Sequence, residues 1–198
     1  MHTKVILSKT ANTPNIVLFY QAASPFSNFY YTEFSANSTN YTCSEQYFMQ
    51  QKALHAGDSG AAREILTKSN PGQMKRIGRG LKMDKKMIES WNLISRKVMY
   101  QACLEKFSQN PEIRLFLLRT HGMKLAEAAP NDCIWGIGLD IHDERAKDIA
   151  NWHGENRLGQ VLEGVRDELW GKEEFRADRE VVEKEDLKTR CWKLEHFK

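Results

Sequence analysis

The longest periodic stretch of the chain is residues 84–108, which read DKKMIESWNLISRKVMYQACLEKFS. Its apolar residues recur at spacings of three and four, the period of an amphipathic helix, and they are Met87, Trp91, Ile94, Val98 and Ala102. Met99, Cys103 and Phe107 flank this stripe. We therefore expect a buried central helix against which the other elements pack.

Shorter elements lie on both sides of this helix. A β-type apolar run at 16–20 leads into a loop rich in aromatic residues, and a second extended piece covers 125–128 before a glycine-bearing loop. Helical patterns with proline or glycine at their ends occur at 44–57, at 60–68, from Pro71, from Pro111 and at 157–170. These patterns predict a mainly α fold with minor β content.

A chain of 198 residues is long enough for one well-buried core and short for two. We expect an N-terminal extension at 1–15, a single domain at 16–171 and a charged appendage at 172–198. The appendage ends in apolar residues, so it is either a docking helix or a frayed end.

The charges are nearly balanced, with 29 Lys and Arg against 26 Asp and Glu. This balance argues against a protein whose main task is non-specific binding to duplex DNA, which needs a concentrated cationic face. No run of eighteen apolar residues exists, and the first residues are too poor in apolar side chains for a secretory signal. We expect a soluble, cytoplasmic protein without a membrane partner.

The cysteines and histidines do not form metal-binding patterns. Cys43, Cys103, Cys133 and Cys191 lie far apart with no C-x-x-C pair, so we expect reduced and mostly buried thiols. The six histidines include no H-x-x-x-H pair. No metal and no cofactor are expected.

Glu45 and Lys52 are the most informative pair of polar residues. A step of seven residues on a helix is about 700°, about 20° short of two turns, so both side chains lie on one face with apolar residues between them. Burial there raises the pKa of a carboxyl group and lowers that of an amine, giving a proton donor and a nucleophile. The alternative, which spacing alone favours, is a capping box from Thr42 to Glu45 with Lys52 in solvent.

Other candidates have a structural explanation beside the functional one. Asn28 binds a ligand edge or forms a turn, and Arg79, near Lys75 and Arg76, binds phosphate or is solvated. Trp91 stacks on a base or packs in the core, and the core is the favoured place. Asp132 is a second carboxylate, or it forms an Asx turn.

Taken together, these residues resemble the NADAR/YbiA-like family over about residues 17–170. The resemblance is specific as an ordered set, and the strings that carry it are 26–30 (FSNFY), 44–53 (SEQYFMQQKA), Gly78-Arg79, Trp91, Lys106-Phe107, 125–128 (LAEA), 132–138 (DCIWGIG) and 154–159 (GENRLG). It implies a single-domain, mainly helical YbiA-like fold and cleavage of an N-glycosidic bond.

The resemblance also implies roles for single residues. Glu45, Lys52 and Asp132 match the family's catalytic positions. Gln46 stands where the family favours His, which leaves the role of that position open. The implied substrate contacts are Asn28, Phe29, Tyr30, Arg79, Trp91, Trp135 and Gly136.

Two kinds of substrate occur in the family: ADP-ribosylated guanine, free or in nucleic acid, and small ribosyl-phosphate intermediates of riboflavin biosynthesis. Residues 139–153 look like an extra helical segment and favour the ADP-ribosyl branch by analogy. As a hypothesis, Lys52 attacks the anomeric carbon and forms a Schiff base, and in the rival scheme Asp132 or Glu45 activates water directly. A non-catalytic sensor of ADP-ribose or NAD and a helical adaptor are alternatives.

Overall fold

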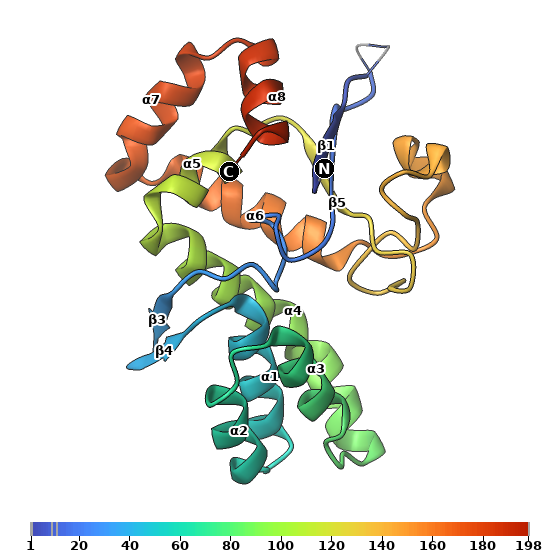
Figure 1. Ribbon diagram of the computed structural model, residues 1–198, viewed down its shortest axis with the longest axis vertical. Helices are drawn as coiled ribbons and strands as arrows, with labels where there is room; N and C mark the ends of the chain where they lie inside the picture. Colours follow the sequence, from blue (N-terminus) through green and yellow to red (C-terminus); the bar gives the residue numbers. More distant parts are fainter. Residues whose placement is uncertain (1, 9, 11, 198) are drawn as a thin grey trace. The chain divides into compact units, whose positions relative to one another are not determined.

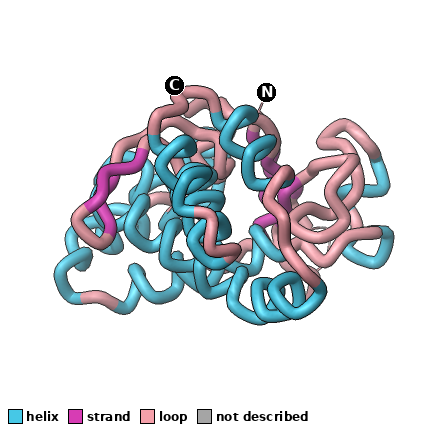
Figure 2. Tube along the Cα trace, turned by 90° about the horizontal axis from the view of Figure 1, so that it is seen from below, coloured by secondary structure: helices cyan, strands magenta, loops and turns pink. Residues whose placement is uncertain are grey.

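The computed structural model describes residues 2–8, 10 and 12–197. Helices account for most of the described chain and strands for little of it (Figure 2), which confirms the predicted mainly α class. The chain divides into two compact units, one made of Met1–Ser27 with Pro111–Lys198 and the other of Asn28–Asn110.

The unit Asn28–Asn110 is a group of helices with a small hairpin. Helix α1 packs against each of the other helices of this unit (Figure 1). The hairpin is antiparallel, and Phe34 is opposite Tyr41. The elements are β3 (Phe34–Ala36), β4 (Thr39–Tyr41), α1 (Ser44–His55), α2 (Ser59–Leu66), α3 (Pro71–Arg79) and α4 (Lys85–Gln109).

The helix boundaries of this unit follow from local side chains. Asp58, Asn70 and Asp84 each accept a hydrogen bond from a backbone N–H in the first turn of α2, α3 and α4. Pro71 occupies the first turn of α3, where a missing N–H costs nothing. Gly57 follows α1 with a φ of 72°. The predicted positions of these helices are therefore confirmed.

The packed face of α4 differs from the predicted stripe. Trp91 and Ala102 are buried as predicted, but Ile94 is 39% exposed and Val98 is half-buried, so the buried face is centred between the predicted stripe and the residues that flank it. The reason is that α4 packs against α1 and β3, and these partners select the face. The buried residues are Trp91, Ser95, Met99, Ala102, Cys103, Lys106 and Phe107.

A lysine therefore lies in the core of this unit. Lys106 is 1% exposed, and its Nζ lies 5.4 Å from the ring centroid of Tyr30 and 5.2 Å from that of Phe107. Burial lowers the pKa of Lys106 to about 8, against the opposing effect of the Cys103 and Cys43 thiols.

The other unit is built on a three-stranded sheet with β2 in the centre. Strand β1 is antiparallel to β2, and β5 is parallel to it. Ordered as they occur, the elements are β1 (Thr3–Ile6), β2 (Ile16–Phe19), α5 (Pro111–Leu118), β5 (Lys124–Glu127), η1 (Glu144–Lys147), η2 (Ile149–Asn151), α6 (Arg157–Gly171), η3 (Glu173–Phe175), α7 (Arg176–Lys184) and α8 (Leu187–Glu195).

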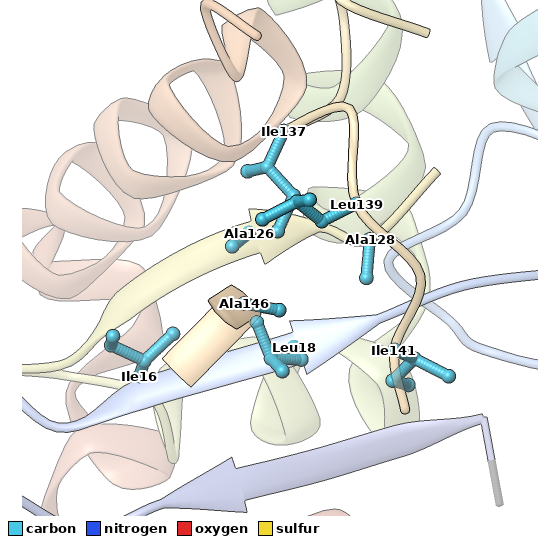
Figure 3. Close-up of a cluster of buried hydrophobic side chains, with 8 residues drawn as sticks. All are labelled: Ile16, Leu18, Ala126, Ala128, Ile137, Leu139, Ile141 and Ala146. Atoms are coloured by element: carbon cyan, nitrogen blue, oxygen red, sulfur yellow. The ribbon is translucent and has the colours of Figure 1, made fainter. Parts of the chain in front are cut away.

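One apolar cluster connects this sheet to the segment after it. Figure 3 shows its members, which are Ile16, Leu18, Ala126, Ala128, Ile137, Leu139, Ile141 and Ala146. The extra helical segment expected at 139–153 takes the form of the short 3₁₀ helices η1 and η2. Ile141 and Ala146 bury their side chains in the cluster, so this segment is an integral part of the core.

The C-terminal residues fold back onto the same unit. Helix α8 packs against β1, and the Glu195 carboxylate accepts a hydrogen bond of 2.8 Å from the Val5 N–H. Glu185 accepts hydrogen bonds from Arg119 (2.9 Å) and Lys193 (2.7 Å). The described part of the appendage is therefore docked on its own unit, which is the docking-helix alternative. Strand β1 lies within the expected extension at 1–15. Residues 1, 9, 11 and 198 of these two segments lie outside the described part.

Asn156 joins α6 to β5. Its φ of 54° is in the left-handed region, and its side chain donates to the Leu125 carbonyl (2.8 Å) and accepts from the Glu127 N–H (3.1 Å). Gly159, one turn along, packs so closely on the strand that a Cβ there would clash with the Leu125 carbonyl oxygen. The 154–159 motif thus serves helix-to-strand packing.

Replacing Gly159 with Ala is expected to lower the free energy of unfolding by about 1–3 kcal/mol, because backbone atoms must move to admit the methyl group. Urea denaturation monitored by circular dichroism measures this change. Gly171→Ala is the matched control in the same helix, since a Cβ there meets nothing within 4 Å. Equal effects of the two substitutions would contradict the packing role of Gly159.

Replacing Lys106 with Met is expected to change how stability depends on pH. Because the pKa of Lys106 is about 8 in the folded state and about 10.4 in an unfolded chain, the unfolded state binds more protons between these values, and raising the pH there favours folding. From about pH 7 to about pH 9.5, the wild type should gain about 2 kcal/mol relative to Lys106→Met.

Denaturant titrations of both proteins at the two pH values test this expectation. Lys97→Met, on the exposed side of the same helix, should leave the difference from the wild type independent of pH. A pH-independent difference for Lys106→Met as well would contradict a buried amine with a lowered pKa.

Candidate active site

Helix α1 brings Glu45 and Lys52 to one side of the unit Asn28–Asn110. Glu45, in the first turn, is 4% exposed, and Lys52, in the last turn, is half-buried. Burial and the neighbouring Arg79 guanidinium lower the pKa of the Lys52 amine, while the Glu45 carboxylate acts in the opposite direction. The three predicted residues therefore share one electrostatic environment.

The start of α1 excludes the capping-box alternative for Glu45. The cap residue is Cys43, and it makes no side-chain hydrogen bond to the helix. Thr42 donates instead to Gln46, through its N–H at 2.9 Å and its hydroxyl at 3.2 Å. The Glu45 carboxyl group is thus not used as a capping group for Thr42.

Gln46, at the position where family resemblance leads one to expect His, has a structural role. Its Nε2 lies within hydrogen-bond distance of three carbonyl oxygens at the end of α2, at 3.2–3.3 Å. The side chain is 2% exposed, so it is a buried bridge between α1 and α2. A neutral histidine offers one acceptor nitrogen and a single N–H donor, whereas the Gln46 amide has two N–H donors for these carbonyl oxygens.

The end of α3 completes the surroundings of Lys52. The Lys52 Nζ donates a hydrogen bond of 2.9 Å to the Gly78 carbonyl oxygen. Gly78 packs against Met49 of α1, so closely that a Cβ would clash with the Met49 side chain. Arg79, the next residue, is exposed. Its guanidinium is therefore available to an anionic group that approaches Lys52.

Asn28 lies beside the first turn of α1. Its carbonyl oxygen accepts a hydrogen bond of 3.0 Å from the Glu45 N–H. The side chain is 9% exposed, and its Oδ1 has no hydrogen-bond partner among the described residues. A buried amide oxygen without a partner is costly, so it marks a place where a ligand N–H or O–H gains a hydrogen bond.

The two aromatic residues after Asn28 are half-buried and lie next to cations. The Nζ of Lys75 is 5.7 Å from the ring centroid of Phe29. The Nζ of Lys106 is 5.4 Å from that of Tyr30. Both separations are within the range of cation–π attraction. These contacts attach the Asn28–Tyr30 loop to α3 and α4.

Trp91 occupies the core position that its place on the helical pattern favours. It is 6% exposed, and its ring lies 5.1 Å from Phe48 and 5.6 Å from His55, centroid to centroid. Both neighbours belong to α1. Trp91 therefore fixes α4 against the helix that carries Glu45 and Lys52, and a stacking contact with substrate stays a prediction.

The other predicted residues belong to the second unit, in the loop after β5. The Asp132 Oδ1 accepts hydrogen bonds from the N–H groups of Ile134 (3.0 Å) and Trp135 (2.8 Å), which is the Asx-turn alternative. Trp135 is half-buried. Gly136 is buried, and its carbonyl oxygen accepts from the Asn156 N–H at 3.1 Å.

Lys106 is the residue of this site that the sequence pattern did not single out. It matches the Lys-Phe pair of the resemblance, but its spacing places it on the buried face of α4, where a charged residue is unexpected. The thiols of Cys103 and Cys43 and the Tyr30 ring surround its amine. The pKa of Cys103 is raised to about 11 by burial, so this thiol is inert at neutral pH.

The cysteines, possible metal ligands and helix hydropathy of the described residues complete the description of the site. Cys43 and Cys103 are buried, Cys191 is half-buried and Cys133 is exposed, and all are free thiols, so the expectation of mostly buried thiols holds in part. Residues 2–8, 10 and 12–197 contain no cluster of three or more His, Cys, Asp or Glu suited to a metal. None of the helices in these residues is long and apolar enough to cross a membrane.

Comparison with known proteins identifies relatives over most of the chain. Protein irg-1 of Caenorhabditis elegans is 52% identical over 211 aligned positions that cover 100% of this chain and 99% of that protein. N-glycosidase YbiA of Shigella flexneri is 33% identical over 157 positions, 78% of this chain and 88% of that enzyme. The NMR structure of the E. coli protein YbiA matches with a TM-score of 0.63 and 32% identity, covering 78% of this chain and 84% of that one.

A family model gives the same result. Residues 18–170 match the model described as the NADAR domain, which includes every predicted site residue of both units. The match ends before η3, α7 and α8, which lie beyond it. The chain belongs to the NADAR domain family.

Proposed function

We propose that this protein is an N-glycosidase that hydrolyses the bond between a ribose anomeric carbon and a base nitrogen, with ADP-ribosylated guanine as its substrate. The observation that carries the proposal is the half-buried Lys52 amine, whose pKa is lowered, on the same helix face as the buried Glu45 carboxyl group. Relatives named N-glycosidases support the reaction class.

In the proposed reaction, the lone pair of the Lys52 amine forms a bond to the anomeric carbon. The base leaves with the electron pair of the glycosidic bond and takes a proton from the Glu45 carboxyl group. The Glu45 carboxylate then takes a proton from the attached nitrogen, whose lone pair forms a C=N bond as the bond between the anomeric carbon and the ring oxygen breaks. The ring oxygen keeps that electron pair and takes the proton back from Glu45, which leaves an open-chain sugar joined to Lys52 as a protonated imine. Water then hydrolyses the imine, which releases the sugar as its aldehyde and restores the amine.

The lowered pKa of Lys52 suits this role because only the neutral amine is a nucleophile. Burial supplies the larger part of the shift, and Arg79 adds to it. The Lys52 bond to the Gly78 carbonyl oxygen holds the amine in place before substrate arrives. Arg79 is proposed to bind a phosphate of the substrate, so it supports catalysis and binding together.

Asn28 is proposed to accept a hydrogen bond from a ribose hydroxyl or a base N–H through its Oδ1. Phe29, Tyr30, Trp91, Trp135 and Gly136 stay predictions as substrate contacts. Asp132 is proposed as a second proton carrier on the strength of family resemblance. One of its carboxylate oxygens accepts from the Ile134 and Trp135 backbone.

Lys52→Arg and Glu45→Gln are each expected to lower kcat/KM by about 100-fold or more, since one lacks the nucleophile and the other the transferable proton. The assay measures guanosine and ADP-ribose released from ADP-ribosylated guanosine by mass spectrometry. For the wild type, the rate should rise with pH through a pKa below the ordinary lysine value, because that pKa is lowered.

Borohydride added during turnover should trap a sugar on the peptide that contains Lys52. Hydrolysis by the wild type without a trapped adduct would contradict the imine and favour direct attack by water. Release of a base from riboflavin intermediates alone would assign the protein to the other substrate class. Tight ADP-ribose binding without hydrolysis of either substrate would identify a sensor.

Asn28→Ala is expected to lower kcat/KM by about 10-fold or more through loss of one substrate hydrogen bond, without lowering the melting temperature. The reason is that the removed Oδ1 has no protein partner among the described residues. Steady-state kinetics and thermal denaturation of the same sample measure the two effects. A lower melting temperature with unchanged kinetics would show that Asn28 is structural.

A further inference from the structure

The small net charge of the chain is the sum of the net charges of the two units, which have opposite signs. Residues 28–110 contain twelve Lys and Arg and seven Asp and Glu, a net charge of +5, whereas the remaining residues sum to −2. The excess is concentrated in 75–97, with eight cations and two carboxylates. This stretch covers most of α3, the connection after it and the first half of α4.

The cations of this stretch are mostly exposed, and its carboxylates are engaged. Asp84 caps α4 by accepting from the Met87 N–H, and Glu89 lies 3.9 Å from Lys85. We call the exposed cations the basic surface, and they are Arg76, Arg79, Lys82, Lys85, Lys86, Arg96 and Lys97.

Four residues of the basic surface belong to α4, and two of them, Lys86 and Lys97, define a line along this helix. Lys86 and Lys97 are eleven residues apart, a rotation about 20° beyond three turns, so they lie on one side of the helix about 16 Å apart along its axis. Leu93 falls between them on the same side and is 84% exposed. The line is therefore open to solvent.

This surface starts at the proposed active site. Arg79 is close enough to lower the pKa of Lys52. His55, one turn after Lys52 on α1, lies 3.2 Å from the Met87 carbonyl oxygen and 2.8 Å from the Ser90 hydroxyl of α4. The cations on α4 thus flank the helix turn that follows Lys52.

We propose that the basic surface binds the phosphate backbone of a nucleic-acid strand whose modified base occupies the Lys52 site. The proposal rests on the proposed function and assigns a polynucleotide rather than a free nucleotide as substrate. A single pyrophosphate can engage Arg79, but cations continue along α4 well beyond it. The line along α4 contains Lys residues and one Leu but no aromatic side chain on which a base could stack. The basic surface therefore contacts the phosphates of the strand, and its binding does not depend on the base sequence.

The test compares two double charge reversals. Lys86→Glu with Lys97→Glu alters the basic surface, and Lys184→Glu with Lys188→Glu is the matched control in the other unit, also at exposed lysines. Binding of a fluorescent, unmodified single-stranded oligonucleotide is measured by anisotropy between about 50 and 200 mM salt. This measurement does not depend on catalysis.

The basic-surface variant should bind the oligonucleotide about 10-fold or more weakly than the wild type. Its slope of log affinity against log salt should be smaller by about 1.4, from two phosphate contacts at about 0.7 each. The control should bind as the wild type does. Equal weakening in both variants, no effect in either, or wild-type binding to anionic lipid vesicles but not to the oligonucleotide would overturn the proposal.

Activity distinguishes this proposal from the proposed function. On ADP-ribosylated guanine within an oligonucleotide, kcat/KM of the basic-surface variant should fall about 10-fold, while hydrolysis of free ADP-ribosylated guanosine stays unchanged. Loss on both substrates would overturn a separate backbone-binding surface. If the wild type hydrolyses neither substrate, the proposed function fails. The anisotropy result then still shows whether the basic surface binds a nucleic-acid strand.

Discussion

The buried side chain of Gln46 is the constraint on which the helical unit depends. It accepts from Thr42 before α1 and donates toward the carbonyl end of α2, so it fixes both the start of α1 and its packing partner. The positions of Glu45 and Lys52 then follow from helix geometry alone. Because both ends of this amide are paired within the protein, Gln46 contributes to the site through position rather than through chemistry.

Residues of the family pattern fall into two groups when their contacts are considered. Gly136 and Gly159 hold the loop after β5 and the start of α6 against the strand through close contacts that leave no room for a Cβ, and Asn156 does so through hydrogen bonds of its side chain. Glu45, Lys52 and Asn28 instead carry buried or half-buried polar groups on α1 and beside its first turn. The family pattern in the sequence contains residues of both groups, and it does not show which of them serve packing and which carry the polar groups of the site.

Much of the fold could be predicted from the sequence because its signals are local. Periodicity located α4, and Asn70 with Pro71 and Asp84 marked helix starts that depend only on adjacent backbone groups. The spacing of Glu45 and Lys52 was likewise sufficient to place them on one face. The buried face of α4, the burial of Lys106 and the docking of α8 on β1 could not be predicted, since each depends on partners distant in sequence.

The ends of the helical unit are tied to each other. Near its start, Ser35 exchanges backbone hydrogen bonds with the Gln109 side chain, and the Asn110 side chain donates to the Glu33 carbonyl. The chain therefore enters and leaves the unit at neighbouring points, and in the sequence the unit lies between β2 and α5 of the other unit. This is the topology of an insertion, in which a whole block can be lengthened, shortened or exchanged while the host sheet keeps its register.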